Sequence, residues 1–284
     1  MKKIIILSFL TFLFNHVFSQ EINLSRVADS IESEGKTLYR SEFASWYGTD
    51  VFNAKCKVQL QKAGGYFSYD TDSGVNNIFF SKDATPVVLA TISFSKDLDP
   101  NNYKIDTVVR QLSDKENDLY TIRQKALADI NRDTLFKVYK NTSLNLIPMV
   151  RNNAKRVYVI TGPEMNGIVL FGNDYLFEFD SNSNITSTKK LHKGLITVDS
   201  KKDTTHIVPA SIHSHLPQYS QFITATDVCT TMLYEKFTTW SQSIVMSKDY
   251  VSIWDCKKNI LVILTMKAWE KMNPAKNSLG NNSH

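Results

Sequence analysis

Apolar residues in the first third of the chain recur first at helical and then at strand-like spacing. Residues 22–61 contain no proline, and their apolar positions, which include Ile31 and Leu38, predict one or two amphipathic helices that end near Gly64. Three short runs rich in aromatic and β-branched residues follow, bounded by Asp, Ser, Gly and Pro. The strands predicted from these runs span residues 65–70, 77–81 and 86–95.

A second helical pattern covers residues 114–140, with an apolar stripe along one side. The polar stretch at residues 151–156 follows Pro148 and marks the expected domain boundary. The sequence therefore predicts an N-terminal α+β region of unknown role at residues 21–150 and a second domain at residues 151–270. The apolar stripe comprises Leu119, Ile122, Ala126, Leu127 and Ile130.

The second half of the chain is rich in strand-like runs. A helix is predicted at residues 225–237, and residues 271–284 form a polar C-terminal tail. Strands interleaved with a helix indicate an α/β (α+β) fold with a mixed sheet in this half. The predicted strands span residues 156–162, 167–172, 175–180, 205–215, 243–247, 250–255 and 259–265.

The first 20 residues have the parts of a secretory signal. Lys2 and Lys3 precede an apolar run from Ile4 to Phe14, and the small residue Ser19 lies at the expected cleavage point. The apolar run is shorter than the ~20 residues that a membrane-spanning helix requires. We therefore expect a secreted or periplasmic protein with no integral membrane segment after the signal is removed.

The charge of the chain is mild. The whole sequence carries a net charge of +5, and removal of Lys2 and Lys3 with the signal leaves +3. Lysine pairs are scattered through polar stretches, so we expect no nucleic-acid partner.

The three cysteines are too few for a disulfide scaffold. If one internal bridge forms, we expect Cys229 to pair with Cys256 because both lie in the C-terminal segment, with Cys56 left over. Sequence alone leaves this pairing open.

The residues with the clearest chemistry lie in the stretch IHSHLPQYSQFITATDVCTTMLY, residues 212–234. On a β-strand, residues i and i+2 point to the same face, so His213 and His215 would present two imidazoles side by side. Asp227 lies in the first turn of the predicted helix, where a loop can return its carboxylate to the end of the strand. Two imidazoles and one carboxylate, with a fourth position left for water, form the ligand set of a catalytic zinc.

The order of these residues resembles the JAMM/MPN-type metallopeptidase domain. That family has the pattern H-x-H-x(10)-D with a serine three residues before the aspartate, and the matching residues here are His213, His215, Thr224 and Asp227. The segment between His215 and Asp227 is one residue longer than the family pattern, and Thr224 replaces the serine. The resemblance covers residues 155–265 and implies a zinc-dependent peptidase or isopeptidase that acts on a peptide or protein.

The resemblance also implies roles for two further side chains. The segment EMNGIVLFG at residues 164–172 is similar to the family's E-x-x-G segment, whose glutamate is the general base. Glu164 would thus take a proton from water and pass it to the leaving amine. Thr224 would help to hold the developing oxyanion.

The same residues also allow an interpretation without metal. Thr224 and Asp227 have the spacing of a capping box, which would satisfy free amides in the first turn of the helix and is compatible with metal binding. His192 and His206 each stand alone in a polar turn or at a strand edge, and we interpret both as surface residues. The alternative function is a non-catalytic secreted binding or envelope-associated protein that keeps the fold with a degenerate site.

Overall fold

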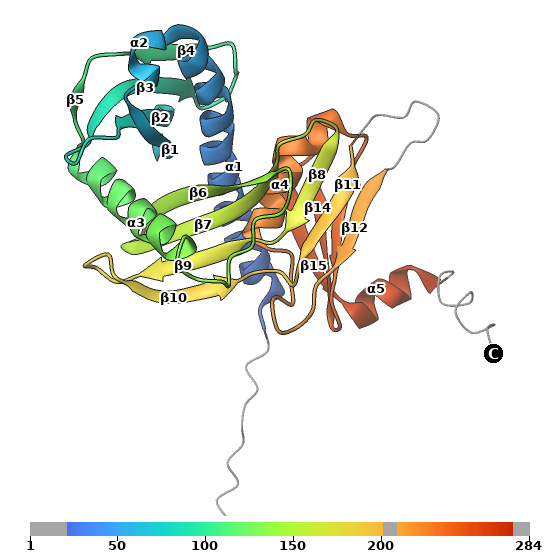
Figure 1. The fold of residues 1–284 in the computed structure, drawn as a ribbon. Helices are drawn as coiled ribbons and strands as arrows, with labels where there is room; N and C mark the ends of the chain where they lie inside the picture. The colour runs from blue at the N-terminus through green and yellow to red at the C-terminus, as the bar shows by residue number, and fades with distance from the viewer. Residues whose placement is uncertain (1–21, 201–208, 275–284) are drawn as a thin grey trace, which may run out of the picture.

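The computed structural model describes residues 22–200 and 209–274. The predicted signal at residues 1–20, most of the predicted polar tail and His206 lie outside these ranges. Helices, antiparallel sheets and one mixed sheet build an α+β fold, which confirms the predicted fold class (Figure 1). Among the described helices, none combines the length and the apolar character that crossing a membrane requires.

The helices follow the predicted order. The first two confirm the helical pattern at residues 22–61, and the fourth confirms the helix expected from residue 225. The helices are α1 (Leu24–Lys55), α2 (Lys57–Leu60), α3 (Asp114–Ile130), α4 (Ala225–Tyr234), the 3-10 helix η1 (Glu235–Phe237) and α5 (Met266–Met272).

Helix α3 ends at Ile130, so the prediction of a helix over residues 114–140 is wrong for its last ten residues. Beyond Ile130 the Asp133 carboxylate accepts a hydrogen bond from the Leu135 amide at 2.8 Å, which stabilises a turn in place of another helical turn. This turn directs Phe136 into the core, where it packs with residues of the central sheet. Of the predicted apolar stripe of α3, Leu119, Ile122 and Ala126 are buried in the core, and Leu127 and Ile130 are partly exposed.

The N-terminal sheet is antiparallel and confirms the three strands predicted between residues 65 and 95. Its order is β1-β2-β3-β4, with the short β5 paired to β3. Helix α1 covers one face, and the rings of Phe52 and Phe79 stack there with centroids 3.8 Å apart. The strands are β1 (Ala63–Thr71), β2 (Gly74–Ser81), β3 (Val87–Ser95), β4 (Tyr103–Asp106) and β5 (Arg110–Gln111).

The central sheet is a second antiparallel sheet, in the order β10-β9-β7-β6. Its first hairpin turns at Asn152 and Asn153, whose φ angles of 50° and 61° are the left-handed values of a tight two-residue turn. The polar stretch that we expected to be a domain boundary is therefore the turn of a hairpin paired along its whole length. The strands are β6 (Thr142–Arg151), β7 (Ala154–Pro163), β9 (Tyr175–Phe179) and β10 (Ile185–Lys190).

The C-terminal sheet is mixed, as predicted. Strand β12 runs parallel to β13, with α4 as the connection between them, and β14 and β15 continue the sheet in antiparallel fashion. A separate two-stranded sheet of β8 and β11 lies beside it (Figure 1). The strands are β8 (Ile168–Gly172), β11 (Leu195–Asp199), β12 (Ala210–Ser214), β13 (Gln242–Met246), β14 (Tyr250–Asp255) and β15 (Ile260–Thr265).

Helix α1 connects these parts because it packs on all of them. It covers the N-terminal sheet at one end and contacts α4 and β15 at the other (Figure 1). At the crossing with α4, a Cβ atom added to Gly35 would lie 2.6 Å from Val228 Cβ, so the two helices approach too closely for any larger residue. The N-terminal helix thus fixes the position of α4.

The cysteines are all free and buried in the structure. The bridge considered between Cys229 and Cys256 is therefore not formed. Cys229 lies on α4 in contact with Leu38 of α1, whereas Cys256 belongs to the core of the C-terminal sheet.

Candidate metal centre

Strand β12 brings the two histidines of the H-x-H motif together. His213 lies opposite Val245 in the parallel ladder, and the His215 amide donates a hydrogen bond to the Met246 carbonyl at 2.8 Å, one residue beyond the end of the strand. The two rings are both buried, with centroids 5.2 Å apart. The structure thus places the imidazoles side by side, as the alternation of a strand predicted.

Helix α4 begins with the predicted capping box. The Thr224 hydroxyl accepts a hydrogen bond from the Asp227 amide at 3.1 Å, and Asp227 Oδ2 accepts one from the Thr224 amide at 2.8 Å. The same hydroxyl donates to Asp227 Oδ2 at 2.7 Å. The cap therefore both starts the helix and holds the carboxylate in one orientation.

The Asp227 carboxylate faces both histidines. Nε2 of His213 is 3.5 Å from Oδ1, and Nε2 of His215 is 3.4 Å from Oδ2. Both Nε2 atoms are buried, and neither has a hydrogen-bond partner among the described residues. Because buried polar atoms normally have a partner, these nitrogens indicate a missing ligand.

His192 joins this cluster, so its interpretation as a surface residue was wrong. It lies between β10 and β11 and is only 6% exposed. Its Nε2 is 3.2 Å from Asp227 Oδ1, and its ring centroid is 4.9 Å from that of His215. No local feature of the polar segment KKLHKG marks His192, since its partners come from elements distant in sequence.

Two of the imidazoles have an oxygen behind the ring, which is within hydrogen-bond distance for His215 and only at ion-pair distance for His192. His215 Nδ1 is 2.8 Å from the Phe222 carbonyl, so Nδ1 carries the proton and Nε2 keeps a free lone pair. His192 Nδ1 is 3.4 Å from Asp174 Oδ2, and Asp174 in turn accepts a hydrogen bond from the Thr161 amide at 3.1 Å. Metal-binding histidines are typically oriented in this way.

The electrostatics of the cluster favour a neutral His215 and an ionised Asp227. Burial lowers the pKa of His215 to about 4, which leaves its ring neutral near pH 7. Burial alone would raise the pKa of Asp227, but the His192 and His215 rings lower it well below its usual value. Burial would lower the pKa of His192, and Asp227 and Asp174 raise it above its usual value.

The donor set fits a zinc ion. One ligand atom each from His192, His215 and Asp227 lies within 4.8 Å of the others, and His213 is outside this compact group although its Nε2 is 3.5 Å from Asp227 Oδ1. Imidazole nitrogens and carboxylate oxygens are the ligands that zinc takes in proteins, and the unpartnered buried Nε2 atoms leave donors available for it.

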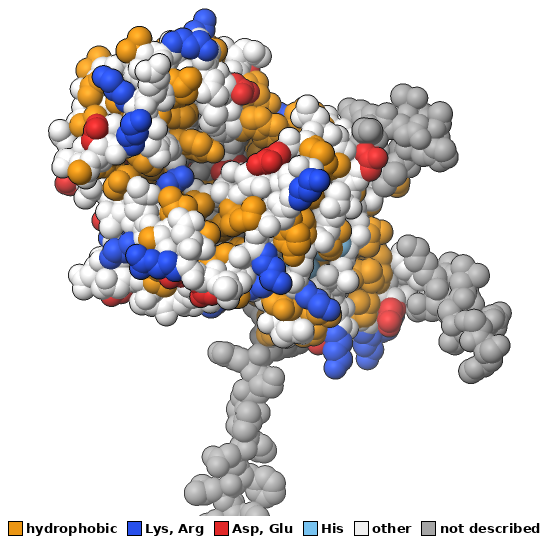
Figure 2. All heavy atoms as spheres, viewed as in Figure 1, with side chains coloured by type: hydrophobic (Ala, Val, Ile, Leu, Met, Phe, Trp, Pro, Cys, Tyr) orange, Lys and Arg blue, Asp and Glu red, His pale blue; other side chains and the backbone are white. Residues whose placement is uncertain are grey.

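A cavity of about 460 Å³ opens beside the histidines. Its walls combine apolar side chains with the three rings, so a substrate could reach the cluster from this side. In Figure 2 only a small area of histidine surface is visible among hydrophobic side chains, and Lys and Arg side chains are spread over the face. The apolar lining comprises Phe171, Leu191, Leu195, Ile196, Leu216 and Tyr219.

The structure does not bring Glu164 to the histidines. It is exposed just after β7, and its amide donates a hydrogen bond to the Asn141 carbonyl at 3.0 Å. Its side chain lines another cavity, of about 340 Å³, together with Glu42 and Trp46. Of the predicted site residues, Thr224, His213, His215 and Asp227 thus lie together, and Glu164 lies apart.

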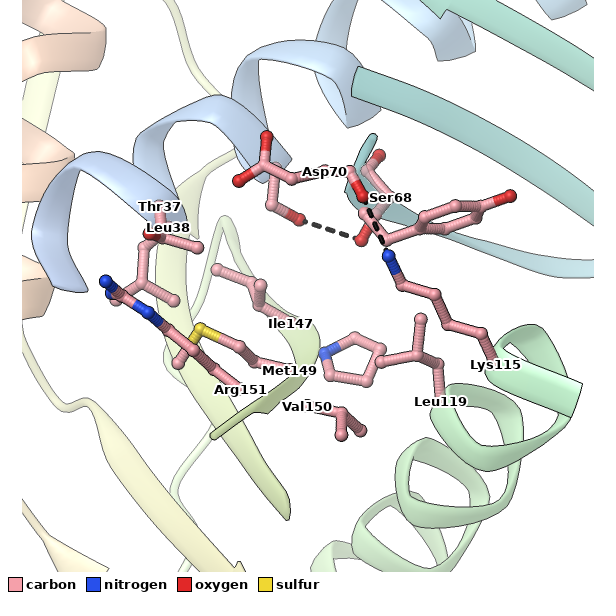
Figure 3. Close-up of a pocket in the computed structure, with 13 residues that line it drawn as sticks. Thr37, Leu38, Ser68, Asp70, Lys115, Leu119, Ile147, Met149, Val150 and Arg151 are labelled. Atoms are coloured by element: carbon pink, nitrogen blue, oxygen red, sulfur yellow. Dashed lines mark hydrogen bonds between the residues drawn. The ribbon is translucent and has the colours of Figure 1, made fainter. Parts of the chain in front are cut away.

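A further cavity of about 320 Å³ lies between α1, β1, α3 and β6 (Figure 3). Its charged side chains are largely engaged in hydrogen bonds with other parts of the chain. Lys115 donates to the Asp70 carbonyl at 2.8 Å, and Arg151 donates to the Ser33 hydroxyl at 3.0 Å. This cavity offers fewer free donor atoms than the histidine cluster.

Comparisons do not assign this arrangement to a family. No family model, no curated protein and no solved structure matches the chain. The interpretation of the site therefore rests on its own geometry and on the resemblance of its motif.

Proposed function

We propose that this chain is an exported, zinc-dependent hydrolase whose site is similar to that of JAMM/MPN-type metallopeptidases and whose substrate contains a peptide or isopeptide bond. The observation that carries the proposal is the buried Asp227 carboxylate, which faces the unpartnered Nε2 atoms of His213 and His215. The connection from β12 through the capped helix α4 to the parallel β13 agrees with the order of elements in that family.

The residues have distinct roles in this proposal. His213, His215 and Asp227 would hold the zinc, which when bound lowers the pKa of water and polarises a carbonyl group. Thr224 fixes the Asp227 carboxylate through its hydroxyl and amide, so positioning the ligand is its first role, ahead of oxyanion contact. The cavity beside the rings would receive the substrate chain.

A specific observation favours a second candidate function. Glu164, the expected proton acceptor, lines a different cavity from the histidines. A zinc site without a general base would bind metal and a partner protein or peptide but would not hydrolyse it. The second candidate is therefore a non-catalytic zinc-binding protein with the same fold.

Metal analysis and hydrolysis assays test both candidates. Protein purified without chelator and with zinc supplied should contain about one zinc per chain, and Asp227→Asn should lose it because the only anionic ligand is removed. Lys193→Ala, an exposed neighbour of the cluster, is the control and should retain zinc. If wild type contains no zinc, both candidates fail.

Glu164→Gln separates the two candidates. If Glu164 is the general base, this variant keeps zinc and loses hydrolysis of peptide and isopeptide substrates. If the zinc-loaded wild type is itself inert on these substrates, the non-catalytic candidate stands. Export is tested separately, because cleavage near Ser19 by a bacterial host should remove the first 19 or 20 residues from the intact mass.

A further inference from the structure

We infer that His192 is a third imidazole ligand of the metal and that Asp174 is its positioning residue, so that the site offers three imidazoles and one carboxylate. This inference rests on the proposed zinc site and goes beyond the H-x-H and aspartate ligands that the motif resemblance implies. The Nε2 atom of His192 is closer to Asp227 than either motif histidine, at 3.2 Å from Oδ1 and 3.3 Å from Oδ2.

The fold holds His192 in place from both sides of its turn. The Leu191 amide donates to the Asp174 carbonyl at 2.8 Å, and the Asn173 amide donates to the Gly194 carbonyl at 2.9 Å. These two bonds tie the segment before His192 and the segment after it to the β8–β9 connection. The ring is therefore positioned by backbone contacts as well as by its own hydrogen-bonding groups.

Gly172 makes this close approach of the two segments feasible. Its φ angle is +88°, and a Cβ atom there would lie 2.3 Å from the Gly194 carbonyl oxygen and 3.2 Å from His192 Cβ. A side chain at residue 172 would thus push the His192 turn away from the cluster.

The burial of two carboxylates around His192 favours a bound cation beside this ring. Asp174 and Asp227 are 2% and 1% exposed, and His192 lies between them with one ring nitrogen toward each carboxylate. Two carboxylates buried against one imidazole are costly in a protein interior unless a cation pairs with them. A divalent cation at the Nε2 atoms would compensate both carboxylates and give the unpartnered His213 and His215 nitrogens a ligand.

A set of four protein donors has a consequence for the chemistry. Catalytic zinc sites keep one of four positions for water, whereas structural sites fill all four with protein ligands. With His192 bound, a water or a substrate carbonyl could reach the ion only as a fifth ligand or in place of one of the four. The ligand role of His192 therefore bears directly on whether the centre is catalytic.

Zinc-edge X-ray absorption on the zinc-loaded wild type and on zinc-loaded His192→Ala tests the inference. The expected spectrum fits three imidazoles and one oxygen donor per zinc, and His192→Ala should lower the fitted number of imidazoles to two. Two imidazoles in both proteins would overturn the inference while leaving the proposed zinc site intact. An absence of bound zinc in the wild type would overturn the proposed function as well.

Zinc affinity provides a second test that does not depend on folding of His192→Ala. Asp174→Asn keeps the size of the side chain and should weaken zinc binding by roughly 10- to 100-fold, the usual effect of losing the partner of a ligating histidine. Lys193→Ala, in the same turn, should bind zinc as the wild type does. Equal affinity of Asp174→Asn and wild type would remove Asp174 from the proposal, and equal affinity of His192→Ala would remove His192.

Discussion

The Thr224 hydroxyl is hydrogen-bonded to both the carboxylate and the backbone amide of Asp227 at the start of α4. The Thr224 hydroxyl donates to Asp227 Oδ2 at 2.7 Å and accepts from the Asp227 amide at 3.1 Å. A helix cap and the orientation of a candidate ligand thus depend on the same pair of residues. The capping role and the ligand-orienting role can be separated by experiment, because only the ligand-orienting role involves metal.

Thr224→Ala should lower the free energy of unfolding by about 1 to 2 kcal/mol in metal-free protein, because the first helical turn loses its side-chain cap. Urea denaturation with a chelator present measures this effect. Thr224→Ser keeps the hydroxyl and should recover most of the loss. An unchanged denaturation midpoint for Thr224→Ala would show that the cap contributes little.

Gly35→Ala should destabilise the protein by about 1 to 3 kcal/mol, since the new methyl group would overlap Val228 on α4 and overpack the interface. The loss should exceed the gain of about 1 kcal/mol that alanine brings to a helix interior. Thermal unfolding of this variant and of Ser30→Ala, at an exposed position of the same helix, provides the comparison. Equal stability of the two variants would contradict the close packing.

The acid sensitivity of the N-terminal region should depend on Glu116. Burial alone would raise its pKa, but hydrogen bonds from Arg110, the Ser113 amide and Tyr69 lower it to about 2 from 4.5. A depressed pKa in the folded state gives stability that is fully present above pH 4.5 and is lost as the pH falls towards 2. Because the Arg110 side chain is 38% exposed, solvent screens this pair, and we expect it to contribute about 1 to 3 kcal/mol to the free energy of unfolding near pH 7.

Glu116→Gln should therefore be less stable than wild type near pH 7 and should show a smaller loss of stability on acidification. Denaturation series between pH 2 and pH 7 measure both effects as the difference in unfolding free energy between the two proteins. Asp114→Asn, an exposed residue in the same helical turn, serves as the control. Parallel pH profiles for Glu116→Gln and wild type would refute the role assigned to the Arg110 pair.

The three cysteines should resist thiol reagents in the folded protein and react together on unfolding. All are buried and free, and burial raises the pKa of Cys256 to about 12 and that of Cys229 well above its usual value. Thiol titration without reductant, before and after addition of denaturant, should count three thiols only in the second case. A count of one after unfolding would indicate that a disulfide forms after all.

Local signals made part of the site predictable from sequence. Alternation on a strand is enough to place His213 beside His215, and the spacing of Thr224 and Asp227 is enough to predict a capped helix. In both cases the residues that interact are close in sequence. The same is true of the N-terminal strands, whose patterns are bounded by turn residues.

The failures of prediction involve contacts between distant segments or ambiguous turns. His192 reaches the cluster because the β10–β11 turn is tied to the β8–β9 connection, and nothing in its own segment shows this. The polar composition of residues 151–156 suits a linker between domains as well as the turn of a hairpin. Only the pairing of the flanking strands shows that it is a hairpin turn. The pattern that suggested Glu164 rests on two residues, which a surface turn can match by chance.

The contact of Glu32 with the last strand has a consequence for how the chain acquires its structure during synthesis. The Leu261 amide donates to Glu32 Oε2 at 2.8 Å, across 229 residues of sequence. At the ~5 to 20 residues per second of translation, α1 leaves the ribosome roughly 10 to 45 s before its C-terminal partners exist. During that interval the apolar side of the helix that later covers α4 and β15 has no native partner. An apolar helix face without its native partner is a site where misassembly can begin, and this contact closes only when the last strand is available.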